Sequence, residues 1–411
     1  MADNKTILVV GTYDTKDDEL AYLAGCIRAQ GGNVVTMDVS VLGDPVTAVD
    51  HSKHDVAREA GSSIEAVIAS GDENSAMQIM AQGSSALAQR LWREGRVDGV
   101  VVLGGSMGTD LALDVCAAIP VGVPKYIVST VAFSPLIPAG RLAADVQMIL
   151  WAGGLYGLNS LCKSSLSQAA GAVLGAARAV ERPSGKPLVG ITGLGKSVLG
   201  YAVPLKPELE ARGFEVAVFH ATGMGWRAFE SLAAQGAFAC VMDFCTQELG
   251  NDVNGSDISA GPDRLTGAGK AGIPQIVAPG CYDLVDIAGW RGVPEKWAGH
   301  ESHAHNRLIT SIVLQESEVQ MVAQAHCRNL ATAKSHSVFL LPTGGCGEWD
   351  RPGKPLHNPK VLAAFCDAIR THCPANVRLE ELACHINDQE FADRALAIFD
   401  EWCDSGVVKS G

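Results

Sequence analysis

Residues 5–40 read KTILVVGTYDTKDDELAYLAGCIRAQGGNVVTMDVS, and this stretch contains one complete β-α-β unit. Residues 5–11 form a largely apolar strand, and residues 18–30 form an amphipathic helix. A pair of glycines ends that helix before the next strand at 33–40. Two short apolar strands joined by a helix are the building block of a parallel sheet.

Further apolar strands are expected at 99–103 and 125–130, with a helical stretch at 111–118 between them. Continuous apolar strands that alternate with helices are typical of a parallel sheet that helices cover on both faces. The first half of the chain is therefore predicted to be an α/β domain with a doubly wound parallel sheet.

A polar segment with Pro and Gly, ERPSGKP at 181–187, separates the two halves of the chain. The same alternation resumes beyond it, with strands expected at 215–220, 238–243 and 274–278. Later elements are expected to be a helix over about 305–332, a strand at 338–341 and helices at 359–371 and 386–402. We predict two Rossmann-like doubly wound domains, residues 1–182 and residues 187–411.

The two halves also resemble each other in sequence. IRAQGGNVVTMDV at 27–39 and LEARGFEVAVFHA at 209–221 share a helix end, a Gly stop and a strand. AIPVGVPKYIVST at 118–130 and AGKAGIPQIVAPG at 268–280 share a Gly-x-Pro entry into an apolar strand. An internal duplication explains both pairs, although two α/β domains also look alike because they share a period. If the duplication is real, loops after equivalent strands face equivalent clefts.

Composition excludes several classes of protein. The 411 residues carry a formal net charge of −13 and no Lys/Arg-rich run, so a nucleic-acid surface is not expected. The most apolar stretch, residues 146–158, is broken by two glycines and is too short to cross a membrane. The chain starts without an export signal, and its 12 Cys form no C-x-x-C pair. A cytoplasmic protein with reduced Cys is expected.

Two loops of the first half have the composition of a phosphate site. Glycines let backbone N–H groups approach an anion closely, and hydroxyls and a Lys add further donors. The carboxylate in the first loop suits Mg²⁺. Each loop follows a predicted strand, and their candidate residues are Gly11, Thr12, Asp14, Thr15 and Lys16 in one and Gly104, Gly105, Ser106, Met107, Gly108 and Thr109 in the other.

The second half contains a P-loop pattern, GITGLGKS at 190–197. In a working P-loop the helix starts directly after the Lys-Ser pair. Here Gly200 and Pro204 interrupt that stretch, so the helix is expected to start only near Pro204. A working ATPase loop is therefore disfavoured, and a phosphate or carboxylate pocket at Lys196 is the milder alternative.

Five motifs together resemble one known family, from Gly11 to Phe391 and in the same order. They are GTYDTK, GGSMGTD, FHATGMGWRAFE, HAHN and CHINDQEFAD. The family is the cytoplasmic one named after the tomato mosaic virus resistance protein, whose bacterial members are largely uncharacterised. The resemblance implies an ATP-binding Rossmann-like first domain and a self-associating protein. It also implies that Asp14, Thr15 and Lys16 lie at the nucleotide and that the 104–107 loop surrounds the phosphates.

This chain departs from the family pattern at two positions. Val41 stands where the family has a Thr, and Glu73-Asn74 stands where it has an Arg-Gly pair. A carboxylate in place of a phosphate-facing cation weakens nucleotide binding. The departures leave open a different ligand, or none, in the first domain.

Polar side chains gather at predicted strand ends and helix starts of the second half. Each has an ordinary interpretation: an N-cap, a solvated loop or a hydrogen-bonded core His. If they converge, they suit a metal site or acid–base chemistry, such as hydrolysis or C–C bond cleavage of a small oxygenated substrate. No ligand spacing identifies a metal. The candidates are His220 and His385 at strand ends, Glu248, His303, His305 and Asn306 at a helix head, and Asp388 at the last helix.

The leading hypothesis is a self-associating protein that binds a small molecule: ATP or a related nucleotide with Mg²⁺ in the first domain, beside a catalytic-type cleft in the second. One alternative is an enzyme that uses the His residues, with metal assistance, while the first domain is a scaffold. A regulatory binding protein without catalysis is the other. No membrane or nucleic-acid partner is expected.

Overall fold

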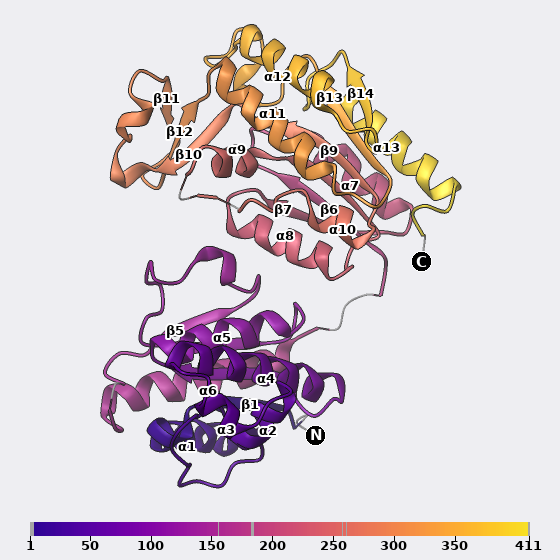
Figure 1. Cartoon of the computed structure of the whole chain (residues 1–411). Helices are drawn as coiled ribbons and strands as arrows, with labels where there is room; N and C mark the ends of the chain where they lie inside the picture. Colours follow the sequence, from indigo (N-terminus) through magenta and orange to yellow (C-terminus); the bar gives the residue numbers. More distant parts are fainter. Residues whose placement is uncertain (1–3, 155, 182–184, 257, 260, 410–411) are drawn as a thin grey trace. The chain divides into compact units, whose positions relative to one another are not determined.

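The structure is a computed structural model that describes residues 4–154, 156–181, 185–256, 258–259 and 261–409. The chain forms two compact units, Met1–Arg182 and Pro183–Gly411 (Figure 1). Each unit has its own parallel sheet and its own apolar core, so each is described by itself.

The N-terminal unit has a five-stranded sheet in the order β2-β1-β3-β4-β5, and every pairing in it is parallel. Its strands are β1 (Thr6–Gly11), β2 (Asn33–Asp38), β3 (Gly99–Gly104), β4 (Lys125–Ser129) and β5 (Gln147–Leu150). Its helices are α1 (Tyr13–Ala29), α2 (Lys53–Glu59), α3 (Ile64–Ile68), α4 (Glu73–Arg93), α5 (Ser106–Ala118) and α6 (Ser160–Ala179), with a 3₁₀ turn η1 (Ala139–Arg141).

Helices cover both faces of this sheet. Strand β1 shows why, because alternate residues of its apolar run belong to two different cores: Leu8 and Val10 pack with α2, α4 and α5, and Ile7 and Val9 pack with α1 and α6. A strand buried on both faces needs a continuous apolar sequence. The doubly wound sheet predicted from residues 5–40 is confirmed.

The C-terminal unit has a six-stranded parallel sheet in the order β14-β13-β9-β8-β6-β7. Its strands are β6 (Leu188–Gly193), β7 (Glu215–His220), β8 (Cys240–Cys245), β9 (Gln275–Gly280), β13 (Ser337–Pro342) and β14 (Arg378–Leu382). Its helices are α7 (Ala202–Ala211), α8 (Met224–Ala234), α9 (Gln247–Val253), α10 (Gly267–Ala271), α11 (Glu316–Leu330), α12 (Pro359–His372) and α13 (Gln389–Asp404).

The two sheets share one topology. In each, the second strand of the unit lies outside the first, and the third, fourth and fifth follow on the other side. Strands β1 and β6 are therefore equivalent, as are β3 and β8. The two pairs of similar sequence also fall on equivalent segments, α1–β2 with α7–β7 and the end of α5–β4 with α10–β9. This agreement supports an internal duplication.

An antiparallel sheet without a counterpart in the described part of the N-terminal unit is inserted between β9 and β13. Its strand order is β10-β12-β11, with bounds Leu284–Ala288, Ile309–Val313 and Ser302–Ala304. The 3₁₀ turns of this unit are η2 (Gly289–Arg291), η3 (Glu295–Trp297) and η4 (Glu348–Asp350).

This insertion corrects the predicted helix over 305–332. The run Ile309–Val313 is rich in β-branched residues and pairs with β10, and α11 starts only at Glu316, after a capping box between Gln315 and Glu318. His305 and Asn306 consequently lie in the turn between two strands and not at a helix head. Likewise His385 lies beyond the end of β14, in the loop before α13.

The apolar stretch 146–158 contains the edge strand β5. In the part of the chain that the structure describes, no helix is both long and apolar enough to cross a membrane.

Candidate functional site

The N-terminal unit has a cavity of about 530 Å³ beside the ends of β1 and β3. These neighbouring strands are where the strand order reverses, and ligands of open α/β sheets bind at such a switch point. Both predicted phosphate loops line the cavity. Its lining contains Thr12, Asp14, Thr15, Lys16, Val41, Leu42, Ile68, Gly71, Asp72, Glu73, Ala76, Met77, Gly104, Gly105, Ser106, Met107 and Gly108.

The loop after β3 presents the N-terminus of α5 to this cavity. Gly105 is the N-cap residue and has no side chain to bond the first turn. For the backbone N–H groups of Ser106, Met107 and Gly108, no acceptor is found among the described residues. Such a bare helix start carries partial positive charge and attracts anions.

Glycine is required at one position of this loop. A Cβ on Gly104 would lie 2.6 Å from Gly108 Cα, whereas a Cβ on Gly105 would have Thr130 Oγ1 as its nearest neighbour, at 3.8 Å. Gly104 therefore allows the tight turn, and Gly105 faces open space. Thr109 is buried, and its hydroxyl contacts Gly105 O and Ser129 Oγ.

The loop after β1 is held by the end of β2. The Asp38 carboxylate accepts from the Tyr13 N–H at 3.2 Å, and the Ser40 hydroxyl accepts from the Asp14 N–H at 3.0 Å. Burial raises the pKa of Asp38, against the hydrogen bonds from Ser40. Gly11 is buried at the end of β1, packed under Leu20 of α1, and does not line the cavity.

Asp14 is the notable side chain of this loop. One of its oxygens accepts from Gly43 N–H at 3.3 Å, while Oδ1 is buried and has no hydrogen-bond partner among the described residues. The Lys16 ammonium lies 5.6 Å from the centre of the Trp151 ring. Asp14 therefore offers an oxygen ligand that no protein group satisfies.

Acidic side chains also line this cavity. Asp72 is the N-cap residue of α4, and its carboxylate accepts from the Ser75 N–H at 2.9 Å. The Glu73 side chain is exposed. Both departures from the family pattern, Val41 and Glu73, are part of the lining. The cavity is thus lined both by the bare start of α5 and by the Glu73 carboxylate, which stands where the family pattern has a cation.

The C-terminal unit has its own cavity of about 500 Å³ at the equivalent place, by the ends of β6 and β8. The inserted sheet contributes one wall of it. The lining contains Leu194, Gly195, Lys196, Ser197, His220, Thr222, Gln247, Leu284, Asp286, His305, Asn306, Ile309, Ser311, Glu348 and Trp349.

The P-loop pattern lines this second cavity without forming a P-loop. After β6 the chain makes a turn closed by a bridge between Leu194 and Val198, and α7 starts only at Ala202. Lys196 is exposed in that turn. The late helix start agrees with the disruption expected from Gly200 and Pro204.

The structure brings only part of the predicted polar residues together. His220, His305 and Asn306 line the second cavity, and the His303 ring packs on Trp349, with centroids 4.6 Å apart. The Asn306 side chain accepts from two backbone N–H groups of its own turn, which is a structural role.

Three further candidates lie outside that lining. His385 is buried, with Nε2 2.9 Å from Gly347 O and 3.1 Å from Asp350 Oδ1. Asp388 accepts from the His385 N–H at 2.8 Å and pairs with Arg351 at 3.0 Å. The third, Glu248, is buried behind the cavity. Among the described residues, no group of three or more His, Cys, Asp or Glu is arranged to hold a metal ion.

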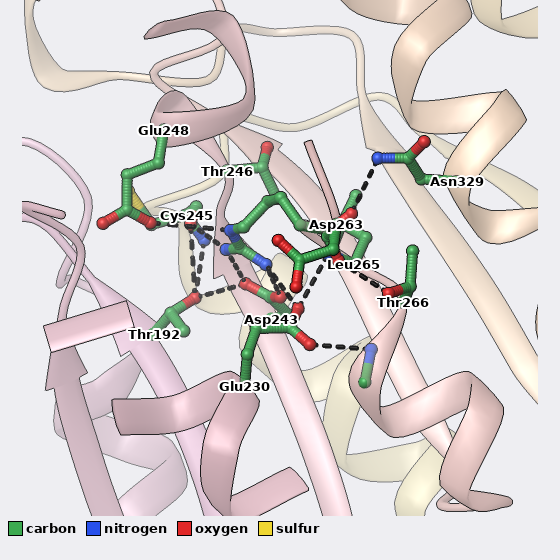
Figure 2. A network of polar contacts seen from close by, with 12 residues as sticks. Thr192, Glu230, Asp243, Cys245, Thr246, Glu248, Asp263, Leu265, Thr266 and Asn329 are labelled. Carbon is green, nitrogen blue, oxygen red and sulfur yellow. Dashed lines mark hydrogen bonds and ion pairs between the residues drawn. The ribbon is translucent and has the colours of Figure 1, made fainter. Parts of the chain in front are cut away.

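Glu248 belongs to a buried charge network around Arg264, whose side chain is fully buried. Acidic side chains from α8, β8 and α9 approach this guanidinium: Glu230 at 3.8 Å, Asp243 as its closest partner, and Glu248 at 3.5 Å (Figure 2). Burial raises the pKa of Glu248 to about 8 and that of Glu230 to about 7, although Arg264 acts in the opposite direction. One cation lies near three carboxyl groups, and burial outweighs its effect on the pKa of both Glu.

Sequence reasoning missed several residues of the second cavity. Gln247 stands next to the predicted Glu248, and Asp286 is the one charged residue in the apolar strand β10. A lone carboxylate within an apolar strand is a signal that could have identified Asp286. Ser311 and Trp349 carried no such signal.

Family models match the two halves of the chain separately. Residues 5–182 match the Uncharacterised protein family (UPF0261) N-terminal domain, and residues 186–403 match its C-terminal domain. The chain belongs to the UPF0261 family.

Relatives within UPF0261 align over almost the whole chain. A UPF0261 protein of Brucella melitensis is 54% identical over 406 residues, which cover 98% of this chain and 97% of the relative. A UPF0261 protein of Clostridium tetani is 35% identical over 393 residues, covering 95% of this chain and 96% of the relative. The tomato ToMV susceptible protein tm-1(GCR26), from Solanum lycopersicum, is 27% identical over 97% of this chain and 56% of its own length. That similarity accords with the motif resemblance in the sequence.

Proposed function

We propose that the N-terminal domain binds a nucleotide, ATP or a close relative, through its phosphate groups. The observation that carries the proposal is the uncapped start of α5, where three backbone N–H groups without acceptors among the described residues face the cavity at the switch point of the sheet. Phosphates bind to such helix starts through N–H groups and the helix dipole.

The residues of the cavity also fit Mg²⁺ as part of this ligand. Asp14 Oδ1 is buried and unpartnered among the described residues, and carboxylate oxygens are preferred Mg²⁺ ligands. Mg²⁺ bound there would neutralise phosphate charge, while Thr12, Thr15 and Lys16 would donate to phosphate oxygens. A nucleotide-sized ligand fits a cavity of about 530 Å³.

Glu73 works against this ligand. Its carboxylate is exposed on the cavity wall and repels phosphate. The affinity expected for Mg-ATP is consequently lower than in a protein with a cation at this position.

Calorimetric titration of the full chain with Mg-ATP tests the proposal, using two substitutions at one residue. The site of Gly105 has room for a Cβ, so Gly105→Ala should bind like the wild type. Gly105→Asp places a carboxylate against the phosphates and should weaken binding about a hundredfold, or roughly 2.7 kcal/mol.

Lys16→Ala should weaken binding by a smaller factor through the loss of one cation. Equal heats for wild type, Gly105→Asp and Lys16→Ala would remove the assignment. Phosphate release assayed in the same samples distinguishes an enzyme from a regulatory binding protein, which would bind ATP without turnover.

A further inference from the structure

We propose that the C-terminal cavity is a second ligand site, which binds a small polyhydroxylated molecule that carries one acidic group. This site is formed entirely by residues of the C-terminal unit and does not depend on what the N-terminal domain binds. Its chemistry follows from an unpartnered amide, a buried carboxylate and an unpaired Lys.

Gln247 gives the first argument. Its side chain lines the cavity, the residue is only 1% exposed, and neither carboxamide atom has a hydrogen-bond partner among the residues described. The amide lies near the Asp286 carboxylate and lowers the pKa of that group, but no hydrogen bond of good geometry joins them. Buried polar groups are nearly always paired, so an unpaired one in a cavity wall points to a ligand.

Hydrogen bonds hold the residues on both sides of Gln247. Cys245 O, two residues earlier, accepts from Arg264 at 2.8 Å. The neighbouring Thr246 hydroxyl lies 2.8 Å from His326 Nε2, and Glu248 accepts from the Gly223 N–H at 2.6 Å. The chain is thus held on both sides of an amide for which no hydrogen-bond partner is found among the described residues. Such support from neighbouring residues is typical of a preorganised binding group.

Asp286 gives the second argument. This residue of β10 is 4% exposed, and its carboxylate accepts from the Ser311 hydroxyl at 2.6 Å. Burial raises its pKa, against that hydrogen bond. A carboxylate accepts hydrogen bonds, and an amide both donates and accepts them. Together, Asp286 and Gln247 match vicinal hydroxyl groups, which also donate and accept, while the Trp349 ring supplies an apolar wall.

Lys196 accounts for the acidic group of the ligand. It is exposed in the turn after β6 and forms no ion pair within the described residues, although it lines the cavity. The acidic Glu348 nearby is already engaged by Arg351 at 3.1 Å. The ammonium therefore attracts a carboxylate or phosphate on the ligand, and His220 and His305 also line the cavity.

Calorimetry on the full chain tests this site with four probes at millimolar concentration. D-Gluconate presents a carboxylate and D-glucose 6-phosphate a phosphate, so these two distinguish the sources of the acidic group. D-Glucitol keeps the hydroxyls without a charge, and acetate keeps a charge without hydroxyls. We expect gluconate or glucose 6-phosphate to bind, glucitol to bind about tenfold more weakly, and acetate to give no heat.

Two variants and their matched controls locate the binding. Gln247→Leu should weaken the bound probe about tenfold or more, since it removes hydrogen bonds to the hydroxyls. Lys196→Met should reduce the affinity for the acidic probe to the affinity measured for glucitol. The exposed Gln324 and Lys360, outside the cavity lining, provide controls: Gln324→Leu and Lys360→Met should bind like the wild type.

Thermal unfolding shows that the variants are folded. Gln247→Leu removes an unpaired buried amide, so its melting temperature without ligand should equal or exceed that of the wild type. The proposal is overturned if neither gluconate nor glucose 6-phosphate binds. It is overturned equally if they bind with unchanged affinity to Gln247→Leu.

Discussion

The two cavities lie at the same switch point of the same topology, yet different parts of the chain build them. In the N-terminal unit the loop after β3 is Gly104–Gly105 followed by an uncapped helix, and the donors are backbone N–H groups. In the C-terminal unit the helix after β8 begins with Gln247, and the polar groups of the cavity are side chains. The same strand order thus carries two chemically different cavities.

The support behind the two sites differs as well. Hydrogen bonds donated to Asp38 and Ser40 hold the N-terminal loop, whereas the C-terminal loop depends on the buried Arg264 and its carboxylates. Backbone donors are fixed by the helix itself, but side-chain donors need a surrounding shell to position them. The comparison teaches that topology sets where a ligand binds and local residues set which ligand it is.

Removing Arg264 should give the largest effect. Arg264→Met leaves Asp243 and its two neighbouring carboxyls buried without a cation, and we expect a loss of about 3–5 kcal/mol in the unfolding free energy of the C-terminal unit. Denaturant unfolding measures this loss. As a control, Arg378→Met removes partly exposed ion pairs and should cost about 1 kcal/mol or less.

Hydrogen exchange shows which of the two units the Arg264→Met substitution destabilises. Peptides of β8 and α9 should lose protection, while those of β1 and α5 should keep it. Unchanged stability in Arg264→Met would show that the network does not support the second site.

A change of charge at Glu73 should sharpen the difference between the cavities. Glu73→Arg restores a cation where this chain has a carboxylate, and Mg-ATP should bind about tenfold more tightly. The same variant should leave gluconate binding unaltered, because Glu73 belongs only to the N-terminal lining. Calorimetry measures both, with Glu65→Arg on the exposed face of α3 as the control. If Glu73→Arg binds Mg-ATP with the same affinity as the wild type or more weakly, the phosphates do not lie near residue 73.

The pH dependence of the stability of the C-terminal unit should show the smallest effect. Burial raises the pKa of Glu248 to about 8 and that of Glu230 to about 7. At pH values between the unfolded pKa and the folded pKa of each group, the folded state binds more protons than the unfolded state. Stability then falls as the pH rises. Buried His326, whose pKa burial lowers to about 4, acts in the opposite direction only below its unfolded pKa of about 6.5.

The range from about pH 6.5 to 8 lies above the titration of His326, so its opposing contribution is absent there. We expect the unfolding free energy to fall there by on the order of 1 kcal/mol. Glu248→Gln keeps an acceptor for Gly223 and should flatten that slope, leaving the smaller contributions of Glu230 and of Asp283, whose pKa burial raises to about 7. Denaturant unfolding at several pH values is the measurement. If Glu248→Gln leaves the slope of unfolding free energy against pH unchanged, the pKa of Glu248 is not raised.

The parallel sheets and the position of both phosphate-type loops were predictable from sequence, because they depend on local patterns. The apolar run of β1 and the glycines after β3 can be recognised in the local sequence, without knowing which segments pack against them. The hairpin of β11 and β12 was not predicted, because a strand of one sheet is stabilised by its partner, and the partner β10 lies more than a dozen residues away. The His residues around it were therefore assigned to the head of a helix, α11, that starts only at Glu316.

By itself the sequence determined the two-domain α/β fold, the switch-point loops and the residues that make α5 an uncapped helix. Only the tertiary structure decided that Glu248 pairs with Arg264, that His385 is buried against Asp350, and that Gln247 and Asp286 share a cavity. The physical reason is distance along the chain. Local propensity is encoded within a few residues, whereas the pairing and burial of a polar group depend on side chains that folding brings from remote segments.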